Sequence, residues 1–408
     1  MTRVVVVGSG GREHALAAVL GRTADEVVVT PGNAGISGSI DTPATELDAD
    51  LFVIGPEVPL VDGLADELRA QGKLVFGPGA DGAQLEGSKA YMKELLVAAG
   101  VPTAAHGSFT EIKPALAFLD TMSAPFVIKT DGLAAGKGVL VTDDRREAEA
   151  ALGEYLSGNA FGAAGSTVVI EEGLVGPEVS VFAICDGTTA VALAPAQDHK
   201  RIFDGDEGPN TGGMGAYTPL PWADPGLVDQ IMTECIEPTL AELRRRGIDY
   251  RGTLFAGLML TESGPKMLEY NVRFGDPETQ VVLPRIESDL VQLLSEAAAG
   301  KIDSQPVFSD DALVTVVCAS EGYPGSARTG DVILGIGDAQ ALDGVSVYCA
   351  GVKANDDGEL ITGGGRVLNV IGRGPTMDEA VVRAYAGVAC ISWPGMQHRT
   401  DIAASALR

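Results

Sequence analysis

The sequence predicts a protein of mixed α/β and α+β class, built from three units. In the first part, short apolar runs alternate with helical segments, which is typical of a parallel sheet. After Ser88 strands and helices follow one another in a mixed order, and the last hundred residues contain many glycines and short strands. A length of 408 residues accommodates two to four folded units. We place the limits at residues 1–87, 88–305 and 306–408.

The N-terminal unit is predicted as a parallel, Rossmann-like α/β domain. Val4–Val7 is a continuous apolar run, as expected for a strand covered on both faces, and a glycine turn and a helix follow it. Further short strands are predicted at Glu26–Thr30, Leu51–Ile54 and Lys73–Phe76, with a helix over Val61–Gln71.

The central unit starts with a helix over Ser88–Gly100, in which Ser88 is the expected N-cap and Gly100 the stop. A long helix is predicted over Leu227–Arg246. The other predicted strands and helices of this unit are Pro125–Thr130, Gly138–Asp143, the helix Arg146–Leu156, Ser166–Leu174, Glu178–Gly187, Phe255–Thr261, Lys266–Val272 and the helix Ser288–Gly300. The C-terminal unit opens with a strand at Ala312–Ser320 and is predicted to be small and rich in β-structure.

Composition excludes several functional classes. The net charge of −27 repels nucleic acids and anionic membranes, so neither is expected as a partner. The five cysteines are widely spaced and form no C-x-x-C pair, which indicates reduced thiols and a cytoplasmic location. No signal peptide and no apolar run of about 20 residues is present. The four histidines are far apart, so a histidine metal site is not expected.

The segment GSGGREH (Gly8–His14) first suggests a dinucleotide site, but Glu13 occupies the third glycine position of that pattern. No acidic residue follows the second strand, so NAD(P) is rejected. Gly10, Gly11 and Arg12 at a helix N-terminus would suit a phosphate monoester. The alternative is a tight βα turn with a solvent-exposed arginine.

The segment DGLAAGKGV (Asp131–Val139) has the flexible glycines and the lysine of a phosphate-binding loop. It is not a Walker A loop, because only three residues separate Gly132 from Gly136, and Gly138 follows Lys137.

The segment MLEYNVRFGDPE (Met267–Glu278) carries the strongest chemical signal. In a strand, Glu269, Asn271 and Arg273 share one face, and Leu268, Tyr270 and Val272 take the other. A carboxylate and an amide oxygen on one face suit Mg²⁺ bound to nucleotide phosphates, and a guanidinium beside them could clamp an anion. The alternative is an edge strand with a solvated polar face.

Two further segments give weaker signals. Gln197–Tyr217 is long, charged and rich in glycine, which is typical of a substrate loop, and its basic end at Lys200 and Arg201 is expected to face the ligand. Val168–Phe182 places three glutamates near a turn, which suits either a nucleotide-binding linker or a solvated face.

Taken together, these segments resemble the glycinamide ribonucleotide synthetase family, ATP-grasp ligases of purine biosynthesis, over nearly the whole chain. The segments that carry the resemblance are GGREHA, PGNAG, GPE with PL (Gly55–Leu60), LEGSKAYMK, IKTDGLAAGKGV, QDHKR, GPNTGGMGAY and RFGDPETQ. The chain departs from the family pattern at Ile36–Leu51, which is shorter than expected by about one helix.

The resemblance implies an ATP-grasp fold with a lid subdomain at about residues 121–187. It implies ATP, Mg²⁺ or Mn²⁺, glycine and 5-phosphoribosylamine as ligands, and a chain that is a monomer or a weak homodimer. The implied metal ligands are Glu269 and Asn271, and the implied catalytic residues are Arg273, Asp276 and Lys129. The implied ATP-binding residues are Lys89, Lys129, Gly132, Gly136, Lys137, Gly138, Glu171, Glu172, Leu174 and Glu178. The implied substrate-binding residues are Gly10, Gly11, Arg12, Glu13, Asn33, Asn210, Thr211, Gly212, Gly213, Met214, Arg273, Asp276, Pro277 and Glu278.

The implied reaction is the ATP-dependent joining of glycine to phosphoribosylamine through glycyl phosphate, with Asp276 or Glu278 as the proton acceptor. Two alternatives differ in the acceptor or in activity: a ligase that activates carbonate, and a nucleotide-binding regulatory protein without catalysis. RFGDPETQ and NTGGMGAY favour the glycine ligase over the first, and the Glu269, Asn271 and Arg273 face argues against the second.

Overall fold

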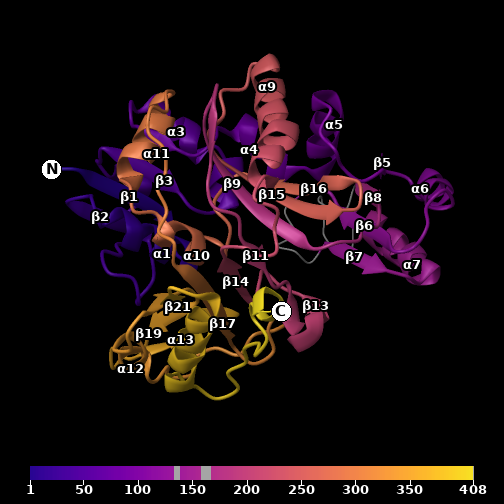
Figure 1. Cartoon of the computed structure of the whole chain (residues 1–408). Helices are drawn as coiled ribbons and strands as arrows, with labels where there is room; N and C mark the ends of the chain where they lie inside the picture. The colour runs from indigo at the N-terminus through magenta and orange to yellow at the C-terminus, as the bar shows by residue number, and fades with distance from the viewer. Residues whose placement is uncertain (133–137, 158–166, 408) are drawn as a thin grey trace.

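The computed structural model describes residues 1–132, 138–157 and 167–407. Four sheets of four or five strands form its framework. The N-terminal sheet and the lid sheet lie on opposite sides of a central antiparallel sheet, and the C-terminal sheet lies below it in Figure 1. Among the described residues, no helix has the length and apolar composition that crossing a membrane requires.

The N-terminal sheet is parallel, with the strand order β2-β1-β3-β4. Its elements are β1 (Arg3–Gly8), α1 (Gly11–Leu20), β2 (Glu26–Pro31), the 3-10 helix η1 (Ala44–Glu46), β3 (Leu51–Ile54), α2 (Glu57–Val61), α3 (Leu64–Ala70), β4 (Val75–Phe76) and α4 (Ala80–Gly87). Val4–Val7 is buried, as its continuous apolar run predicts. The short Ile36–Leu51 connection contains only η1, so no α-helix joins β2 to β3. The helix predicted over Val61–Gln71 is present as α3, but it starts only at Leu64, because Gly63 has a φ of +89° and separates α3 from α2.

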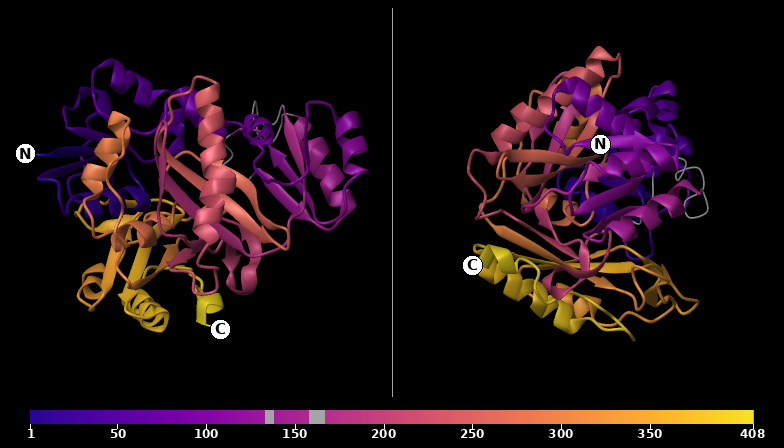
Figure 2. Two further views of the ribbon diagram at one scale, coloured as in Figure 1. Left: turned by 45° about the horizontal axis from the view of Figure 1, so that its top comes forward. Right: turned by 90° about the vertical axis from the view of Figure 1, so that its right-hand side faces the viewer.

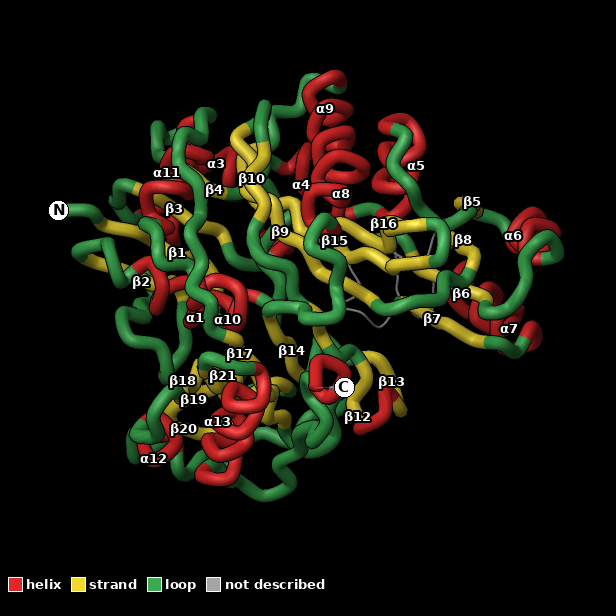
Figure 3. Tube along the Cα trace, viewed as in Figure 1, coloured by secondary structure: helices red, strands yellow, loops and turns green. Residues whose placement is uncertain are grey.

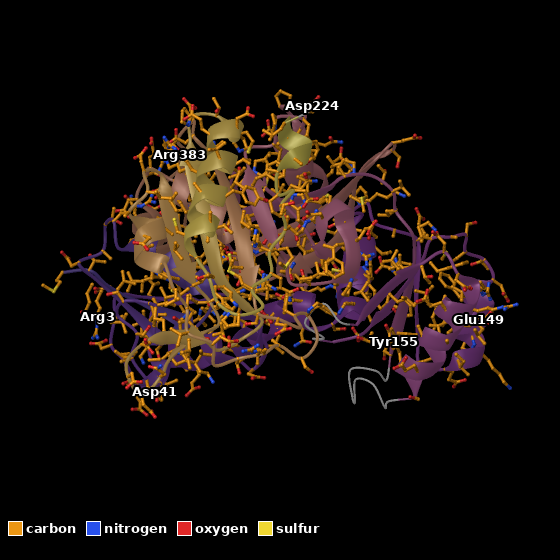
Figure 4. The ribbon with its side chains drawn as sticks, turned by 90° about the horizontal axis from the view of Figure 1, so that it is seen from below. Arg3, Asp41, Glu149, Tyr155, Asp224 and Arg383 are labelled. Atoms are coloured by element: carbon orange, nitrogen blue, oxygen red, sulfur yellow. The ribbon has the colours of Figure 1, made fainter. Side chains whose placement is uncertain are left out.

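The lid sheet has the order β5-β8-β6-β7 and is covered by α6 and α7. The elements in this region are α5 (Lys89–Ala99), β5 (His106–Phe109), α6 (Ile112–Leu119), β6 (Phe126–Thr130), β7 (Val139–Thr142), α7 (Arg145–Leu156) and β8 (Val168–Glu172). The lid projects from the rest of the molecule, and Glu149 and Tyr155 on α7 lie at the end opposite Arg3 (Figure 2, Figure 4). Ser88 caps α5 by accepting the Tyr91 N–H, and Gly100 ends the helix in the left-handed conformation, as predicted.

The central sheet has the order β10-β9-β15-β16. The elements around it are β9 (Glu178–Asp186), β10 (Ala190–Ala192), α8 (Leu227–Ile231), the π-helical turn η4 (Met232–Ile236), α9 (Glu237–Arg245), β15 (Arg251–Thr261), β16 (Gly264–Asn271), α10 (Thr279–Val282), η5 (Leu283–Arg285) and α11 (Leu290–Ala299). The predicted helix over Leu227–Arg246 is continuous but contains η4. It packs on the buried face of β16, where the Tyr270 hydroxyl donates to the Cys235 carbonyl at 3.0 Å.

The C-terminal sheet has the order β11-β14-β17-β21-β18. The remaining elements are β11 (Gln197–Asp198), β12 (Arg201–Phe203), η3 (Asp204–Asp206), β13 (Glu207–Asn210), β14 (Gly215–Thr218), β17 (Ala312–Ala319), α12 (Ile336–Gln340), β18 (Val345–Cys349), β19 (Val352–Ala354), β20 (Leu360–Thr362), β21 (Arg366–Gly374), α13 (Met377–Cys390) and η6 (Ala404–Leu407). The sequence reading did not predict α13, which packs along β21 and β17 (Figure 3). Both ends of the long loop, β11 and β14, belong to this sheet, so the C-terminal domain anchors the loop at Gln197–Tyr217.

Candidate active site

Strand β16 presents Glu269 and Asn271 on one face, while Tyr270 and Val272 are buried on the other. A β-bulge opposite Gly257 and Leu258 interrupts the strand. Because the bulge adds one residue, Met267 rather than Leu268 enters the core beside Tyr270, and Leu268 is half-buried. The prediction that Leu268 shares the buried face is therefore wrong, and the prediction for Glu269 and Asn271 is unaffected.

The Glu269 carboxylate lies near the ammonium groups of Lys200, Lys129 and Lys89, which we call the cationic cluster. Burial alone would raise the pKa of Glu269, but the charges of Lys200, Lys129 and Lys89 lower it below the ordinary value. Within the described part of the chain, the carboxylate has no hydrogen bond and no ion pair of its own. An ionised carboxylate and a neighbouring carboxamide, both unengaged, fit a hard divalent cation, and the surrounding ammonium groups fit the triphosphate that would accompany it.

The N-terminus of α5 holds the start of the glycine-rich loop. Asp131 accepts the Ala90 N–H at 3.2 Å and the Ser88 hydroxyl at 3.1 Å, and Lys89 Nζ donates to the Gly132 carbonyl at 2.9 Å. The Gly138 carbonyl accepts the Thr130 N–H at 2.8 Å, which closes the hairpin between β6 and β7. The other two predicted loop residues, Gly136 and Lys137, lie outside the described residues.

The possible nucleotide-binding linker, Val168–Phe182, contacts the same cationic cluster. Glu171 is buried and pairs with Lys129 at 2.9 Å, whereas Glu172 pairs with Lys266 at 3.0 Å on the surface side of β8. Leu174 is half-buried in the connection to β9. Glu178, an implied ATP-binding residue at the start of β9, pairs with Lys200 at 2.6 Å. A nucleotide bound at Glu178 would therefore also meet the Lys200 ammonium group.

Sequence reasoning named Lys200 only as a possible phosphate contact and missed Asp198 beside it. Burial lowers the pKa of Lys200, but Glu178 and Asp198 raise it well above its ordinary value. Burial, with the charges of Glu278 and Glu178, raises the pKa of Asp198 to about 7 against the lowering effect of Lys200. Lys200 belongs to the cationic cluster, but Arg201 does not, because its guanidinium donates to the Gly208 carbonyl at 2.7 Å within the loop. Asp206, in the middle of the loop, pairs with the buried Arg399.

Arg273 differs from the expectation that it clamps a substrate anion. Its guanidinium pairs with Glu86 at 2.9 Å and with Glu57 at 3.2 Å, both in the N-terminal part of the chain. Burial would lower the pKa of Arg273, but Glu86 and Glu57 raise it, so the group stays charged. In this structure Arg273 joins β16 to α2 and α4, and neither glutamate was predicted from the sequence.

The N-terminus of α1 is built around Glu13. Its carboxylate accepts the Gly10 N–H and the Arg12 Nε–H, both at 2.6 Å. A Cβ at Gly8 or Gly55 would lie within 2.6 Å of this side chain, which explains both glycines. Arg12 is buried and also donates to the Phe274 carbonyl at 3.2 Å, so the alternative of an exposed arginine is wrong.

Residues from three parts of the chain meet at the Asp276 loop. Arg366 of β21 pairs with the Asp276 carboxylate at 3.2 Å and donates to the Gly212 carbonyl at 2.5 Å. Gly213, with a φ of +107°, packs against Pro277, where a Cβ would lie 2.4 Å from the proline ring. A Cβ at Gly10 would lie 3.6 Å from the Asp276 carboxylate, so the start of α1 borders this loop. Arg366 was not predicted, because its partners lie 90 or more residues away in the chain.

The remaining predicted substrate residues each contact different neighbours. Thr211 bonds the Lys200 carbonyl at 2.8 Å, Met214 is buried beside Ile202, and Asn210 is half-buried at the end of β13. Glu278 is buried, accepts the Ser180 hydroxyl at 3.3 Å, and has a pKa raised by its burial.

Asn33 joins two domains. Its amide donates to the Ser9 carbonyl at 2.8 Å and to the Ala350 carbonyl at 3.0 Å, and its oxygen accepts the Gly35 N–H. The carboxamide is therefore engaged with backbone from the C-terminal domain, and a substrate contact through it would have to replace one of these bonds.

A lid hairpin, a cationic cluster and a carboxylate–carboxamide pair on one antiparallel strand define an ATP-grasp ligase, which uses ATP and a divalent metal ion. Comparison with known proteins gives the same class. Models of the three parts of phosphoribosylglycinamide synthetase match the chain: the N domain at residues 2–86, the ATP-grasp (A) domain at residues 87–279 and the C domain at residues 313–405. The chain belongs to the phosphoribosylglycinamide synthetase family.

Individual relatives are similar over their full length. The chain is 49% identical to a phosphoribosylamine–glycine ligase of Streptomyces coelicolor, with 99% of each chain covered. The crystal structure of phosphoribosylamine–glycine ligase from Thermotoga maritima has a TM-score of 0.87 and 34% identity, covering 98% of this chain and 100% of that one. The biotin carboxylase domain of Hydrogenobacter thermophilus 2-oxoglutarate carboxylase shares the fold, with a TM-score of 0.74 and 17% identity. The match covers 97% of this chain and 91% of that one.

Proposed function

We propose that this protein joins glycine to 5-phosphoribosylamine, consuming ATP and giving glycinamide ribonucleotide, ADP and phosphate in purine biosynthesis. The observation that carries the proposal is the cationic cluster beside Glu269, on the strand that also carries Asn271, with Lys200 of this cluster also near Glu278. Membership of the phosphoribosylglycinamide synthetase family and the full-length relatives support the choice of substrates.

The first step is attack of the glycine carboxylate on the γ-phosphate of ATP, which brings two anions together. Lys129, Lys89 and Lys200 of the cationic cluster offset the charge that develops, despite the chain's net charge of −27. Glu269 and Asn271 would hold Mg²⁺, or Mn²⁺, which neutralises phosphate charge when bound. Gly132, Gly136, Lys137 and Gly138 of the hairpin loop are proposed to cover the triphosphate, and Glu171, Glu172, Leu174 and Glu178 to line the nucleoside.

The second step is attack of the phosphoribosylamine nitrogen on the acyl carbon of glycyl phosphate. Water would destroy this intermediate, so the lid must exclude solvent during the step. The attacking amine loses a proton, and we assign its acceptor as Glu278 rather than Asp276. Burial raises the pKa of Glu278, which makes it the better base, whereas Asp276 is engaged by Arg366 and Gln280.

The predicted substrate residues divide between two roles in this proposal. Gly10, Gly11 and the Asn210–Met214 segment would line the phosphoribosylamine site. Arg12, Glu13, Asn33, Thr211 and Arg273 have their side chains engaged within the protein and would shape the site.

The domain limits of 1–87, 88–305 and 306–408 are kept as proposals, supported by the ranges of the family models. The predicted lid limits of about 121–187 differ from the lid sheet, which includes β5 (His106–Phe109) and ends with β8, whereas β9 belongs to the central sheet. Five free cysteines support a cytoplasmic location. The large apolar side chains exposed among the described residues are spread over separate elements, which supports a monomer or a weak homodimer.

A coupled assay of ADP release tests the proposal. Turnover should require glycine and phosphoribosylamine together. The same fold occurs in a biotin carboxylase domain, so bicarbonate is the informative alternative substrate. Bicarbonate-dependent turnover, or no turnover with the glycine pair, would refute the proposed activity.

A further inference from the structure

Lys93, Lys129 and Glu171 are ionised side chains from three elements that meet in the interior, next to the other lysines of the cationic cluster. Lys93 of α5 lies 2.9 Å from Glu171 Oε2, and Lys129 of β6 lies 2.9 Å from Glu171 Oε1. The relative exposure of Lys93 is 1% and that of Glu171 is 2%. Each oxygen of one carboxylate on β8 therefore holds one ammonium group, and none of the proposed reaction steps uses Lys93.

Lys93 is also connected to the strand that carries Glu269 and Asn271. Its ammonium donates to Thr103 Oγ1 at 2.7 Å, and the Thr103 hydroxyl donates to the Met267 carbonyl at 2.7 Å. The Met267 N–H in turn donates to the Pro102 carbonyl at 2.7 Å. On the other side of Glu171, Lys129 Nζ lies 3.5 Å from the Leu268 carbonyl. The network thus joins two strands of the lid sheet to β16 at the residues just before Glu269.

The charges of the network explain why a second buried lysine is useful. With Lys129 alone, Glu171 would hold that ammonium group in place but would also cancel its charge toward a phosphate. Lys93 supplies a second positive charge to the same carboxylate, so the group of three keeps one net positive charge. Burial lowers the pKa of Lys93 to about 8 while Glu171 opposes the shift, so the ammonium group remains protonated at neutral pH. Buried ion groups stabilise folds poorly compared with apolar residues, so stability alone does not account for this arrangement.

We propose that Lys93 is a positioning residue of the nucleotide site: through Glu171 it holds Lys129 in place without cancelling its charge, and it fixes the lid sheet to β16. Lys93 itself contacts no substrate. The inference rests on the proposed function in that it takes Lys129 as a ligand of the ATP phosphates.

The test is the affinity of purified Lys93→Met for a non-hydrolysable ATP analogue with Mg²⁺, measured by calorimetry without glycine or phosphoribosylamine. The dissociation constant should rise at least about tenfold, as expected when a charge-assisted contact is lost. The KM for ATP should rise in parallel, and the KM values for glycine and phosphoribosylamine should not. Lys113→Met, at an exposed lysine on the lid helix α6, is the matched control and should bind like the parent.

A double-mutant cycle separates positioning from a purely structural role. Lys93→Met/Glu171→Gln removes the carboxylate that would cancel the charge of Lys129, so it should recover part of the affinity that Lys93→Met loses, and the two effects should not add. Lys93→Arg keeps the charge and should bind the analogue more tightly than Lys93→Met. If Lys93→Met does not fold, Thr103→Val, which removes the hydroxyl between Lys93 and Met267, should weaken binding in the same direction.

Folded Lys93→Met, or folded Thr103→Val in its place, with parental affinity for the analogue would overturn the proposal, even if its melting temperature fell. Because binding is measured without the other substrates, this result is distinguishable from failure of the proposed activity. That failure would appear as parent protein that binds the analogue yet releases no ADP with glycine and phosphoribosylamine.

Discussion

Arg366 holds Asp276 at two points: one guanidinium nitrogen lies 3.2 Å from the carboxylate, and another donates to the Asp276 carbonyl at 2.7 Å. The same guanidinium binds the Gly212 carbonyl. An arginine from the C-terminal sheet therefore connects the Asp276 loop to the Gly212 segment, and these two loops also pack on each other through Gly213 and Pro277. This relationship assigns the C-terminal domain a role in shaping the acceptor side of the site.

Arg366→Met should lower kcat/KM for phosphoribosylamine by about 100-fold, because displacing a reacting group by about 1 Å costs a factor of that order. Binding of an ATP analogue should change little, since Arg366 contacts neither Lys89 nor Lys129. Arg366→Lys should not restore activity, because a single ammonium group cannot reproduce the fork that reaches two loops. Arg328→Met, at an exposed arginine of the same domain, is the control. Equal losses in nucleotide and phosphoribosylamine binding would contradict a local role.

Glu269→Ala should lower turnover by at least about 1000-fold, because metal ions contribute several kcal/mol to such transition states. The free energy of unfolding should change by only about 1 kcal/mol, since the carboxylate makes no hydrogen bond or ion pair with the described residues. Steady-state ADP release and chemical denaturation measure the two effects. Glu262→Ala, at an exposed residue in the turn between β15 and β16, should leave both unchanged. A Glu269→Ala enzyme with parental rate would show that the metal lies elsewhere.

Gly213→Ala should disturb the contact between two substrate loops. Its φ of +107° disfavours a side chain, and the new methyl group would meet the Pro277 ring at 2.4 Å. We expect a stability loss of about 1–3 kcal/mol and a raised KM for phosphoribosylamine. Gly337→Ala, where a methyl group meets nothing within 4 Å, is the comparison. If Gly213→Ala kept the parental KM, the close packing of Gly213 on Pro277 would not matter for substrate binding.

Asp198 should make stability depend on pH. Its pKa is about 7 in the folded chain and about 4 when unfolded, so the folded state retains a proton that the unfolded state loses between these values. The free energy of unfolding should therefore fall as pH rises through this window, and the Asp198 contribution should level off above it. Asp198→Asn should reduce the decline between about pH 5 and about pH 7.5 by an amount on the order of 2 kcal/mol. Asp356→Asn, at an exposed aspartate, should show the parental decline, and an unchanged decline in Asp198→Asn would contradict this interpretation.

Features set by neighbouring residues could be predicted from the sequence. Ser88 and Gly100 limit α5 through local hydrogen bonding and backbone conformation, and strand alternation places Glu269 and Asn271 on one face. The bulge before Glu269 could not be predicted, because it depends on the register of β15 against β16.

Features set by distant residues were missed. Arg273 is engaged by Glu57 and Glu86, which are about 200 residues away in the sequence, and only folding reveals that these carboxylates take its guanidinium. Lys93 reads in the sequence as one residue of an ordinary helix. Its partner Glu171 lies on strand β8 of the lid sheet, far along the chain, so no local pattern identifies the pair.

The central claim is that β16 offers Glu269 and Asn271 to the metal that accompanies ATP. A crystal structure with Mg²⁺ and a non-hydrolysable ATP analogue tests it most directly. The account predicts a metal ion at about 2.1 Å from a Glu269 carboxylate oxygen and from the Asn271 amide oxygen, with its other ligands from phosphates and water. A metal ion held by other side chains, with Glu269 and Asn271 unengaged, would contradict the claim.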